Sequence, residues 1–254
     1  MKKFLLGAVA LASIAVATSA HAVGITRVSA ADFVAGSGLI TFSEFANGTV
    51  NPTYAPAVYG GDAASPTVTF DGWFLGQSLS VNPGVDCPGA AASACIVGTP
   101  TGPLSLDPSA PNTFITGDGA NPTSPVLSGS PTFNGGIAVL FDIELAGVGF
   151  DGGFFDAAGS TGITAFARDG SLLGTVTNTG TGIEFLGLVT DDGSEAIAGV
   201  FLDLTGSEPA GFAIDNLRFG RRGQVVNPVP EPASFAVLGL GLAVAGFAAR
   251  KRRA

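Results

Sequence analysis

The chain has 254 residues and a formal net charge of −9, a length that suits one domain with a sizeable core. Its two terminal segments hold six of the 11 basic residues, so residues 23–227 carry five arginines against 19 acids, a net charge near −14. Such a body repels phosphate backbones, which excludes nucleic acid and favours neutral polysaccharide or divalent cations. The single histidine, His21, lies in the first 22 residues. Residues 23–227 therefore lack a Ser-His-Asp relay, a Cys-His nucleophile pair and the usual zinc site.

The first 22 residues have the pattern of a secretory signal peptide. Lys2 and Lys3 precede an apolar run over residues 4–17, and the small-residue site Ala20-His21-Ala22 follows. A basic start, a short apolar stretch and an A-x-A exit predict cleavage by signal peptidase after Ala22. The alternative is an uncleaved membrane anchor, but the run is shorter than the roughly 20 residues that a spanning helix needs.

Residues 23–227 predict one all-β domain. The clearest strand is Ile137–Leu145, where five apolar residues alternate with neighbours that include Asp142 and Glu144, the period-two pattern of a half-buried strand. An Asp169-Gly170 pair between two further strands is typical of a tight hairpin turn. Strand spacing of about 8–12 residues with turns between predicts an antiparallel, jelly-roll-like β-sandwich. The other expected strands cover residues 39–45, 67–70, 113–116, 148–155, 163–167, 172–177, 183–189, 197–204 and 212–219.

Residues 82–130 differ from the rest of the body, because they are rich in Pro, Gly, Ala and Ser and thin in large apolar residues. We expect a long loop-like excursion with one or two short strands, either functional or disordered. It contains both cysteines, Cys87 and Cys95. An even count in an exported chain favours a disulfide. A metal pair is the alternative, although two cysteines without histidine do not complete a tetrahedral site.

Residues 228–254 form a third unit. Val229-Pro230-Glu231-Pro232 precedes an apolar stretch from Ala233 to Ala249, and the basic residues Arg250, Lys251, Arg252 and Arg253 follow. As a helix the 17 apolar residues span about 25 Å, slightly less than a bilayer core of about 30 Å, and the arginine side chains can reach the headgroups. The pattern predicts one transmembrane helix with its basic end in the cytoplasm and the acidic body outside.

This order of Pro-Glu-Pro, apolar helix and basic tail resembles the PEP-CTERM sorting signal of Gram-negative bacteria. The resemblance implies recognition, and cleavage near Pro230-Glu231-Pro232, by a membrane protease called exosortase. It further implies an inner-membrane-anchored precursor that becomes a cell-surface or extracellular protein associated with exopolysaccharide and biofilm. A plain C-terminal membrane anchor is the alternative interpretation.

Two stretches, residues 39–45 and 211–219, resemble the ends of jelly-roll carbohydrate-binding modules and of other exported PEP-CTERM proteins. The resemblance implies that the first and last strands pair and that acids on them hold a structural calcium. It nominates Glu44 and Asp215 as ligands, with Asn216 less firmly; calcium takes six to eight oxygen ligands and needs no histidine. The ordinary alternatives are a turn-capping acid for Asp215 and a solvated acid for Glu44. No other cofactor is expected.

Two classes of function fit the sequence. The first, which we expect, is a non-catalytic β-sandwich that contacts exopolysaccharide or matrix proteins. The alternative is a glycoside hydrolase that uses two carboxylates, although no pair of acids is singled out by the sequence. Among the aromatic residues, Trp73, Tyr54 and Tyr59 are the best suited to stack on a sugar, and for Trp73 core packing is the commoner role.

Overall fold

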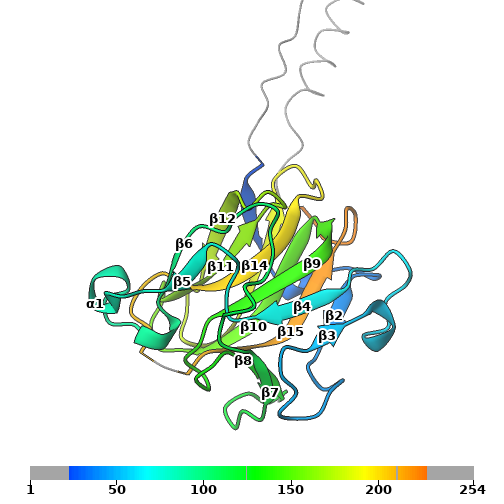
Figure 1. Cartoon of the computed structure of the whole chain (residues 1–254). Coiled ribbons are helices and arrows are strands. Elements are labelled where there is room, and N and C mark those ends of the chain that lie inside the picture. Colours follow the sequence, from blue (N-terminus) through cyan, green and yellow to red (C-terminus); the bar gives the residue numbers. More distant parts are fainter. Residues whose placement is uncertain (1–22, 124, 210, 228–254) are drawn as a thin grey trace, which may run out of the picture.

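The computed structural model of the protein describes residues 23–123, 125–209 and 211–227. The expected signal peptide, sorting motif and C-terminal helix lie outside these ranges. In the described part of the chain, no helix is long and apolar enough to cross a membrane. These residues form two antiparallel sheets that pack face to face, with a small two-stranded sheet beside them (Figure 1). The prediction of an all-β sandwich is therefore confirmed.

The first large sheet has its strands in the order β1, β13, β10, β15, β8, β7, and β2 also pairs with β15. All the pairings are antiparallel. The pairing of β2 with β15 joins the two stretches that the sequence placed at the ends of one sandwich, with Leu39 opposite Arg218. The strands are β1 (Ile25–Val28), β2 (Gly38–Ile40), β7 (Phe114–Thr116), β8 (Val126–Ser128), β10 (Gly147–Phe155), β13 (Gly182–Thr190) and β15 (Ala213–Gly220).

The second large sheet has the order β12, β11, β14, β9, β4, β3. Its hairpin β11–β12 turns at Gly170, which has a φ of 84°. The turn needs a residue with left-handed backbone at this position, and the glycine of the Asp-Gly pair adopts it readily. The predicted turn is therefore confirmed. The strands are β3 (Thr53–Tyr54), β4 (Val68–Asp71), β9 (Ile137–Leu145), β11 (Thr161–Phe166), β12 (Leu172–Thr177) and β14 (Ile197–Leu204).

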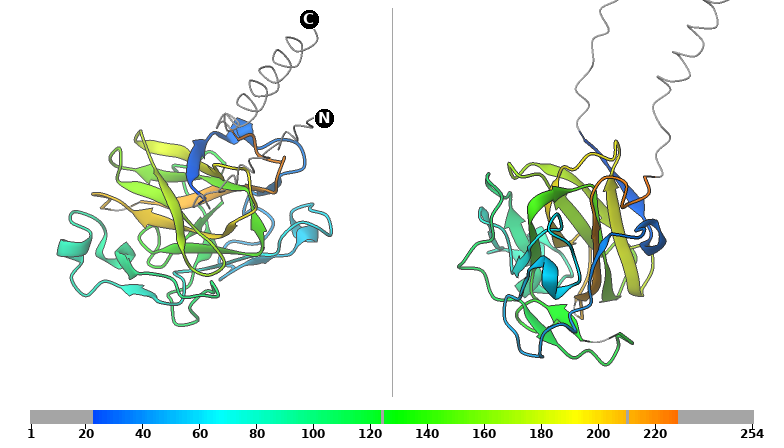
Figure 2. Two further views of the ribbon diagram at one scale, coloured as in Figure 1. Left: turned by 90° about the horizontal axis from the view of Figure 1, so that it is seen from above. Right: turned by 90° about the vertical axis from the view of Figure 1, so that its right-hand side faces the viewer.

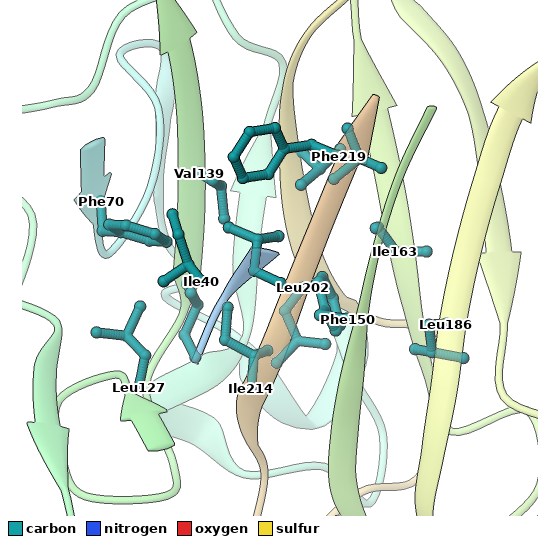
Figure 3. Close-up of a cluster of buried hydrophobic side chains, with 14 of the residues drawn as sticks. Ile40, Phe70, Leu127, Val139, Phe150, Ile163, Leu186, Leu202, Ile214 and Phe219 are labelled. Carbon is teal, nitrogen blue, oxygen red and sulfur yellow. The ribbon is translucent and has the colours of Figure 1, made fainter. Parts of the chain in front are cut away.

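The main core lies between the two large sheets and takes side chains from both (Figure 3). Phe150, Leu186 and Ile214 come from the first sheet, while Val139 and Leu202 come from the second. The alternation expected for residues 137–145 is observed, because the apolar positions lie buried or half-buried and Asp142 is exposed. Burial of these large side chains supplies the main driving force for folding.

The excursion over residues 82–130 is more ordered than predicted. It holds three short strands in place of the one or two expected: β6 (Ile96–Gly98), which pairs with β5 (Gln77–Leu79), and β7 and β8, which extend the first large sheet. Local hairpin-like pairings order β6 and β7, and the pairing of β8 with the distant strand β15 joins β7 and β8 to the sheet. The excursion also contains the single-turn helix α1 (Pro83–Asp86) and the 3-10 turn η3 (Ala92–Ala94), and two others lie earlier: η1 (Ala30–Asp32) and η2 (Pro56–Val58).

The strand expected over residues 39–45 is shorter than predicted. It ends at Ile40, because Phe42 adopts a φ of 57° and the carboxylate of Glu44 accepts hydrogen bonds from the N–H and hydroxyl of Thr41. The left-handed backbone at Phe42, and the turn that the Glu44 side chain closes, prevent further strand hydrogen bonds beyond Ile40. Glu44 therefore lies in a turn, where the sequence had suggested a strand.

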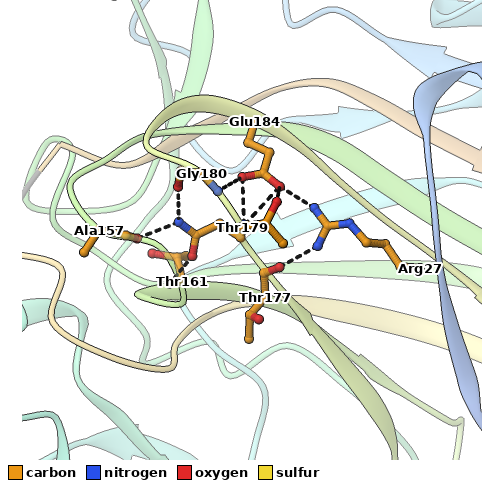
Figure 4. A network of polar contacts seen from close by, with 8 residues as sticks. Arg27, Ala157, Thr161, Thr177, Thr179, Gly180 and Glu184 are labelled. Atoms are coloured by element: carbon orange, nitrogen blue, oxygen red, sulfur yellow. Dashed lines mark hydrogen bonds and ion pairs between the residues drawn. The ribbon is translucent and has the colours of Figure 1, made fainter.

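One side of the sandwich is closed where the edge strands of the two sheets meet (Figure 4). Arg27 of β1 donates a hydrogen bond to the carbonyl of Thr177, the last residue of β12, and forms an ion pair with Glu184 of β13. Glu184 also accepts the N–H groups of Thr179, at 2.9 Å, and Gly180, at 2.7 Å. Burial alone would raise the pKa of Glu184, but these donors and the Arg27 charge outweigh it, and the pKa is lowered.

Candidate functional site

The described chain begins and ends at the same end of the sandwich, as the blue and orange segments show (Figure 2). Near the start, the carbonyl of Gly24 accepts the N–H of Asp191, at 2.9 Å. At the other end, the Asn227 side chain donates from Nδ2 to the carbonyls of Thr190, at 3.2 Å, and Asp191, at 2.6 Å. Both ends thus meet at the turn between β13 and β14. The predicted signal-peptide cleavage and the Pro-Glu-Pro motif both lie within a few residues of this end.

Residues 221–227, which we call the C-terminal strap, lie along the chain that contains η1. The N–H of Val34 donates to the carbonyl of Gln224, at 3.0 Å, and the N–H of Val226 donates to the carbonyl of Asp32, at 2.8 Å. Between these bonds, Val225 pairs with Phe33 in an isolated antiparallel bridge. The two side chains are buried together with Val28 and Val189, in a small cluster distinct from the main core.

The acidic turn from Asp191 to Glu195 holds the other side of the strap. Arg221 donates to the carboxylate of Glu195 from Nη2, at 3.1 Å. The turn itself is an ordinary one, with a bond from the N–H of Gly193 to the carbonyl of Thr190 and a φ of 67° at Gly193. This geometry is that of a plain turn between two strands.

A second cluster surrounds Asp215, which is fully buried on β15. Its carboxylate accepts hydrogen bonds from the hydroxyl of Thr123 and from Nδ2 of Asn121, at 3.3 Å. Asn216 donates its backbone N–H to Asp215, at 2.7 Å, and adopts a φ of 46°, which asparagine tolerates better than most residues. Burial raises the pKa of Asp215, and the charge of Asp151 adds to the rise while the bond from Thr123 opposes it.

Asp151 joins this cluster from the neighbouring strand. It lies opposite Asp215 in the register of β10 against β15, next to a shift in that register after Gly149. The side chain of Asn216 donates from Nδ2 to Asp151, at 2.8 Å, and to Asp215, at 3.3 Å. The register shift is typical of a β-bulge. The pairing with Asp215 was missed, because no local pattern links strands so far apart in sequence.

Glu44, the other predicted ligand, lies in a separate network. Its Oε1 accepts the N–H of Thr41, at 3.0 Å, while Oε2 is buried without a hydrogen-bond partner. The hydroxyl of the fully buried Tyr54 also lacks a partner, and burial together with the charge of Glu44 raises the pKa of that phenol. Among the described residues no hydrogen bond joins Glu44 to Asp215.

The donor atoms around Asp215 fit a hard cation in chemical type. The two carboxylates and the hydroxyl of Thr123 are oxygen groups of the kind that calcium takes, whereas Asn121 and Asn216 turn their Nδ2 donors towards the carboxylates. In the described part of the chain, however, no group of three or more acidic, cysteine or histidine side chains gathers at one point. Calcium binding therefore stays a prediction. If calcium binds, Asp151 is better placed than Glu44 to share the ion with Asp215.

The aromatic residues considered for sugar stacking are mostly part of the interior. Trp73 is 8% exposed and belongs to a second apolar cluster, and Tyr54 is fully buried. Tyr59 is half-buried, packs edge-on against Phe219 and donates its hydroxyl to the carbonyl of Pro66. Core packing, the commoner role for Trp73, is therefore the one that the structure shows.

A hollow beside the strap is lined by acids that are already paired. Glu144 accepts a bond from Arg168, at 2.9 Å, and Glu195 is paired with Arg221. The hydrogen bonds from these arginines lower the pKa of both glutamates. A general acid needs the opposite shift, so neither glutamate is suited to protonate a leaving group at neutral pH.

Cys87 and Cys95 are joined in a disulfide, with Cα atoms 5.8 Å apart, as the even cysteine count favoured. The loop that it closes is docked on the sandwich: the N–H of Ala91 donates to the carbonyl of Glu208, at 2.9 Å. The Glu208 side chain is fully buried and accepts the hydroxyl of Ser160, at 2.6 Å. This loop is therefore an ordered part of the domain.

Comparison with known families identifies the segment that follows the strap. Residues 228–253 match the PEP-CTERM protein-sorting motif, as the resemblance noted from the sequence implied. The chain thus carries this motif directly after an antiparallel β-sandwich. The motif indicates an exported protein that exosortase sorts and implies a membrane-anchored precursor. No curated protein sequence matches the chain.

Proposed function

We propose that this chain is a non-catalytic cell-surface or matrix protein that is delivered to the cell exterior through its PEP-CTERM motif and works together with exopolysaccharide. The observation that carries the proposal is the position of the motif. It begins at residue 228, one residue after the described sandwich ends at Asn227. Because the start of the body lies at the same end, this end would face the inner membrane during export, first through the signal peptide, which is removed after Ala22, and then through the helix from Ala233 to Ala249 in the bilayer.

Further support comes from the body. β2 pairs with β15, so the two stretches that resemble the ends of jelly-roll carbohydrate-binding modules lie side by side, although β1 precedes β2 and pairs with β13. The domain is acidic, which suits neutral polysaccharide and cations better than anionic polymers. The ordered excursion, pinned by the disulfide, fits a protein that persists outside the cell.

The proposal of a non-catalytic role rests on the state of the described carboxylates. The pair formed by Asp151 and Asp215 is the closest to a two-carboxylate arrangement, but Asp215 is fully buried beneath Thr123. Glu144 and Glu195 line a hollow and are held charged by arginines. A glycosidase needs one protonated and one charged carboxylate on opposite sides of an accessible sugar.

The test compares three strains of the source bacterium: one without the gene, one with the full chain and one with a chain that stops after Asn227. We expect the full chain to restore retention of exopolysaccharide in the matrix, and the truncated chain, which is exported without the motif, to restore less. Equal restoration by both would contradict a role for sorting. Turnover of an exopolysaccharide by the secreted protein, lost on Asp151→Asn or Glu195→Gln, would favour the hydrolase instead.

A further inference from the structure

The distance between the folded body and the sorting motif is very short. Asn227 is hydrogen-bonded to Thr190 and Asp191, and Pro230 follows three positions later. Three residues of fully extended chain reach about 10 Å at most. A protease that binds an extended segment around Pro230-Glu231-Pro232 also needs the residues just before it, because substrates are held along several residues of backbone. With the strap docked, the chain up to Asn227 is held on the body.

The contacts that dock the strap are specific. Two backbone hydrogen bonds join Gln224 and Val226 to the chain from Asp32 to Val34. Val225 is 7% exposed and packs against Phe33. At the edges of this contact, Gln224 donates from Nε2 to the carbonyl of Gly36, at 2.7 Å, and Arg221 is paired with Glu195. The strap is therefore part of the native fold and does not act as a free linker.

The same contacts allow the strap to open without unfolding the sandwich. Val225 belongs to a small cluster with Val28, Phe33 and Val189, separate from the core between the sheets. The strand before the strap, β15, ends at Gly220 and keeps its own partners β10, β2 and β8. Terminal segments with few buried apolar contacts open at much lower free energy than the core of a domain.

We propose that the C-terminal strap gates processing of the sorting motif. Docked, it holds residues 221–227 on the body and leaves too short a chain before Pro230 for the membrane protease to bind. Released, it supplies about seven more residues of extended chain and lets the protease bind. This inference rests on the proposed sorting function and adds the device that regulates it. In the folded precursor, the rate of the cut then depends on opening of the strap.

Locking the strap covalently tests the gate. Phe33 and Val225 form a bridge flanked by the bonds from Val34 to Gln224 and from Val226 to Asp32, the pattern of a non-hydrogen-bonded antiparallel pair. Such pairs have Cα atoms about 4.5 Å apart, within the range of disulfides. The double variant Phe33→Cys/Val225→Cys should therefore form a disulfide outside the cytoplasm. Each single cysteine variant is the matched control for loss of the apolar side chain.

The measurement is a pulse–chase of the full-length chain in its own host, with mass determination of the precursor and the processed form. We expect the double variant to be processed at least several-fold more slowly than either single variant. A flexible spacer of ten Gly and Ser residues after Asn227, which adds a mean reach of about 17 Å, should restore the rate in the locked chain. Asn227→Ala, which removes two bonds that dock the strap, should speed processing without any new cysteine.

The outcomes separate the two proposals. If the oxidised double variant is processed as fast as the single variants, or if Asn227→Ala and the spacer leave the rate unchanged, the gate is contradicted while sorting stands. If the natural chain and the spacer variant are both recovered with intact C-termini, the sorting function itself is contradicted, and the gate with it.

Discussion

Asp151 and Asp215 lie opposite each other on neighbouring strands, and the side chain of Asn216 donates a hydrogen bond to each of them. Two carboxylates this close repel each other unless a proton, a donor or a cation intervenes. Asn216 supplies one donor, and Thr123 and Asn121 supply others to Asp215. The cluster ties the loop between β7 and β8 to the centre of the first sheet.

The first prediction concerns calcium at this cluster. If a calcium ion neutralises Asp151 and Asp215, a chelator should lower the melting temperature of the protein recovered from culture. For a hundredfold excess of calcium over its Kd, binding adds about 2.7 kcal/mol, or roughly 5–10 °C for a domain of this size. Differential scanning calorimetry with and without chelator measures the shift.

Asp215→Asn should remove the response to chelator, because the substitution keeps the shape of the side chain and removes its charge. Glu44→Gln separates the two predicted ligands: it should leave the response intact, since Glu44 lies in its own network with Thr41. The matched control is Asp192→Asn in the exposed turn. A melting curve of the natural protein that does not change with chelator would end the calcium hypothesis.

The second prediction concerns pH and the buried Glu208. Burial raises the pKa of Glu208 above its ordinary value of 4.5, although bonds from Ser160 and Asp156 oppose the rise. The folded state therefore binds more protons than the unfolded state between the ordinary and the raised pKa, and its stability falls as pH rises through that window. Glu208→Gln should abolish this loss, so the natural protein should lose stability relative to the variant as pH rises above about 4.5.

Urea denaturation of both proteins at several pH values between about 2.5 and 8 measures this difference. Asp192→Asn provides a control of opposite sign: the bonds from Ser194 lower the pKa of Asp192. The lowered pKa stabilises the natural protein at pH values above the pKa of Asp192 in the unfolded state. This stabilisation is lost as the pH falls through the pKa of Asp192 in the folded state. A constant difference between the natural protein and Glu208→Gln across the range would contradict the assignment.

The third prediction concerns the closed side of the sandwich. Glu184→Ala removes the acceptor for Arg27, Thr179 and Gly180, and should lower the free energy of unfolding by about 1–3 kcal/mol. Glu144→Ala removes an ion pair with Arg168 whose glutamate side chain is 42% exposed, and should cost less than about 1 kcal/mol. Equal losses for the two variants would show that Glu184 does not hold the edge strands together.

The fourth prediction concerns the disulfide. Cys87 and Cys95 are eight positions apart, and replacing both by serine opens the loop between them. In the chain-entropy account this should lower the free energy of unfolding by about 2–3 kcal/mol. The loop remains docked through Ala91 and Ser93, which bond to the carbonyls of Glu208 and Asn134. We therefore expect faster limited proteolysis near residues 87–95, with the sandwich itself still folded. Unchanged proteolysis would show that docking alone orders the loop.

Much of the fold could be predicted because its long strands carry their own pattern. Ile137–Leu145, Leu172–Thr177 and Ile197–Leu204 have the bounds expected from alternating or continuous apolar runs. The short strand β7 falls within the strand expected over residues 113–116. The strands β6 and β8 have three residues each, too few to show a period, and β8 is placed by its pairing with β15 far along the chain. The early end of β2 at Ile40 depends on the left-handed Phe42, a conformation that no residue pattern announced.

The candidate site was less predictable than the fold. Asp215 was found through the resemblance of its strand, but its partners Asp151, Asn121 and Thr123 come from other elements, with Asn121 94 positions away. The docking of the strap was not anticipated either, since Val225 and Phe33 carry no motif and meet only when both ends of the body fold together. The sorting motif itself is a local, ordered series of residues, which is why the sequence was enough to find it.

The central claim is that the protein is exported and sorted through its C-terminal motif, and intact mass spectrometry of the protein from membrane and extracellular fractions tests it most directly. We predict a precursor in the membrane fraction and a released form that begins at Val23 and ends near Pro230-Glu231-Pro232. Recovery of only one form, in membranes and with its C-terminus intact through Ala254, would make the tail a plain anchor and contradict the account.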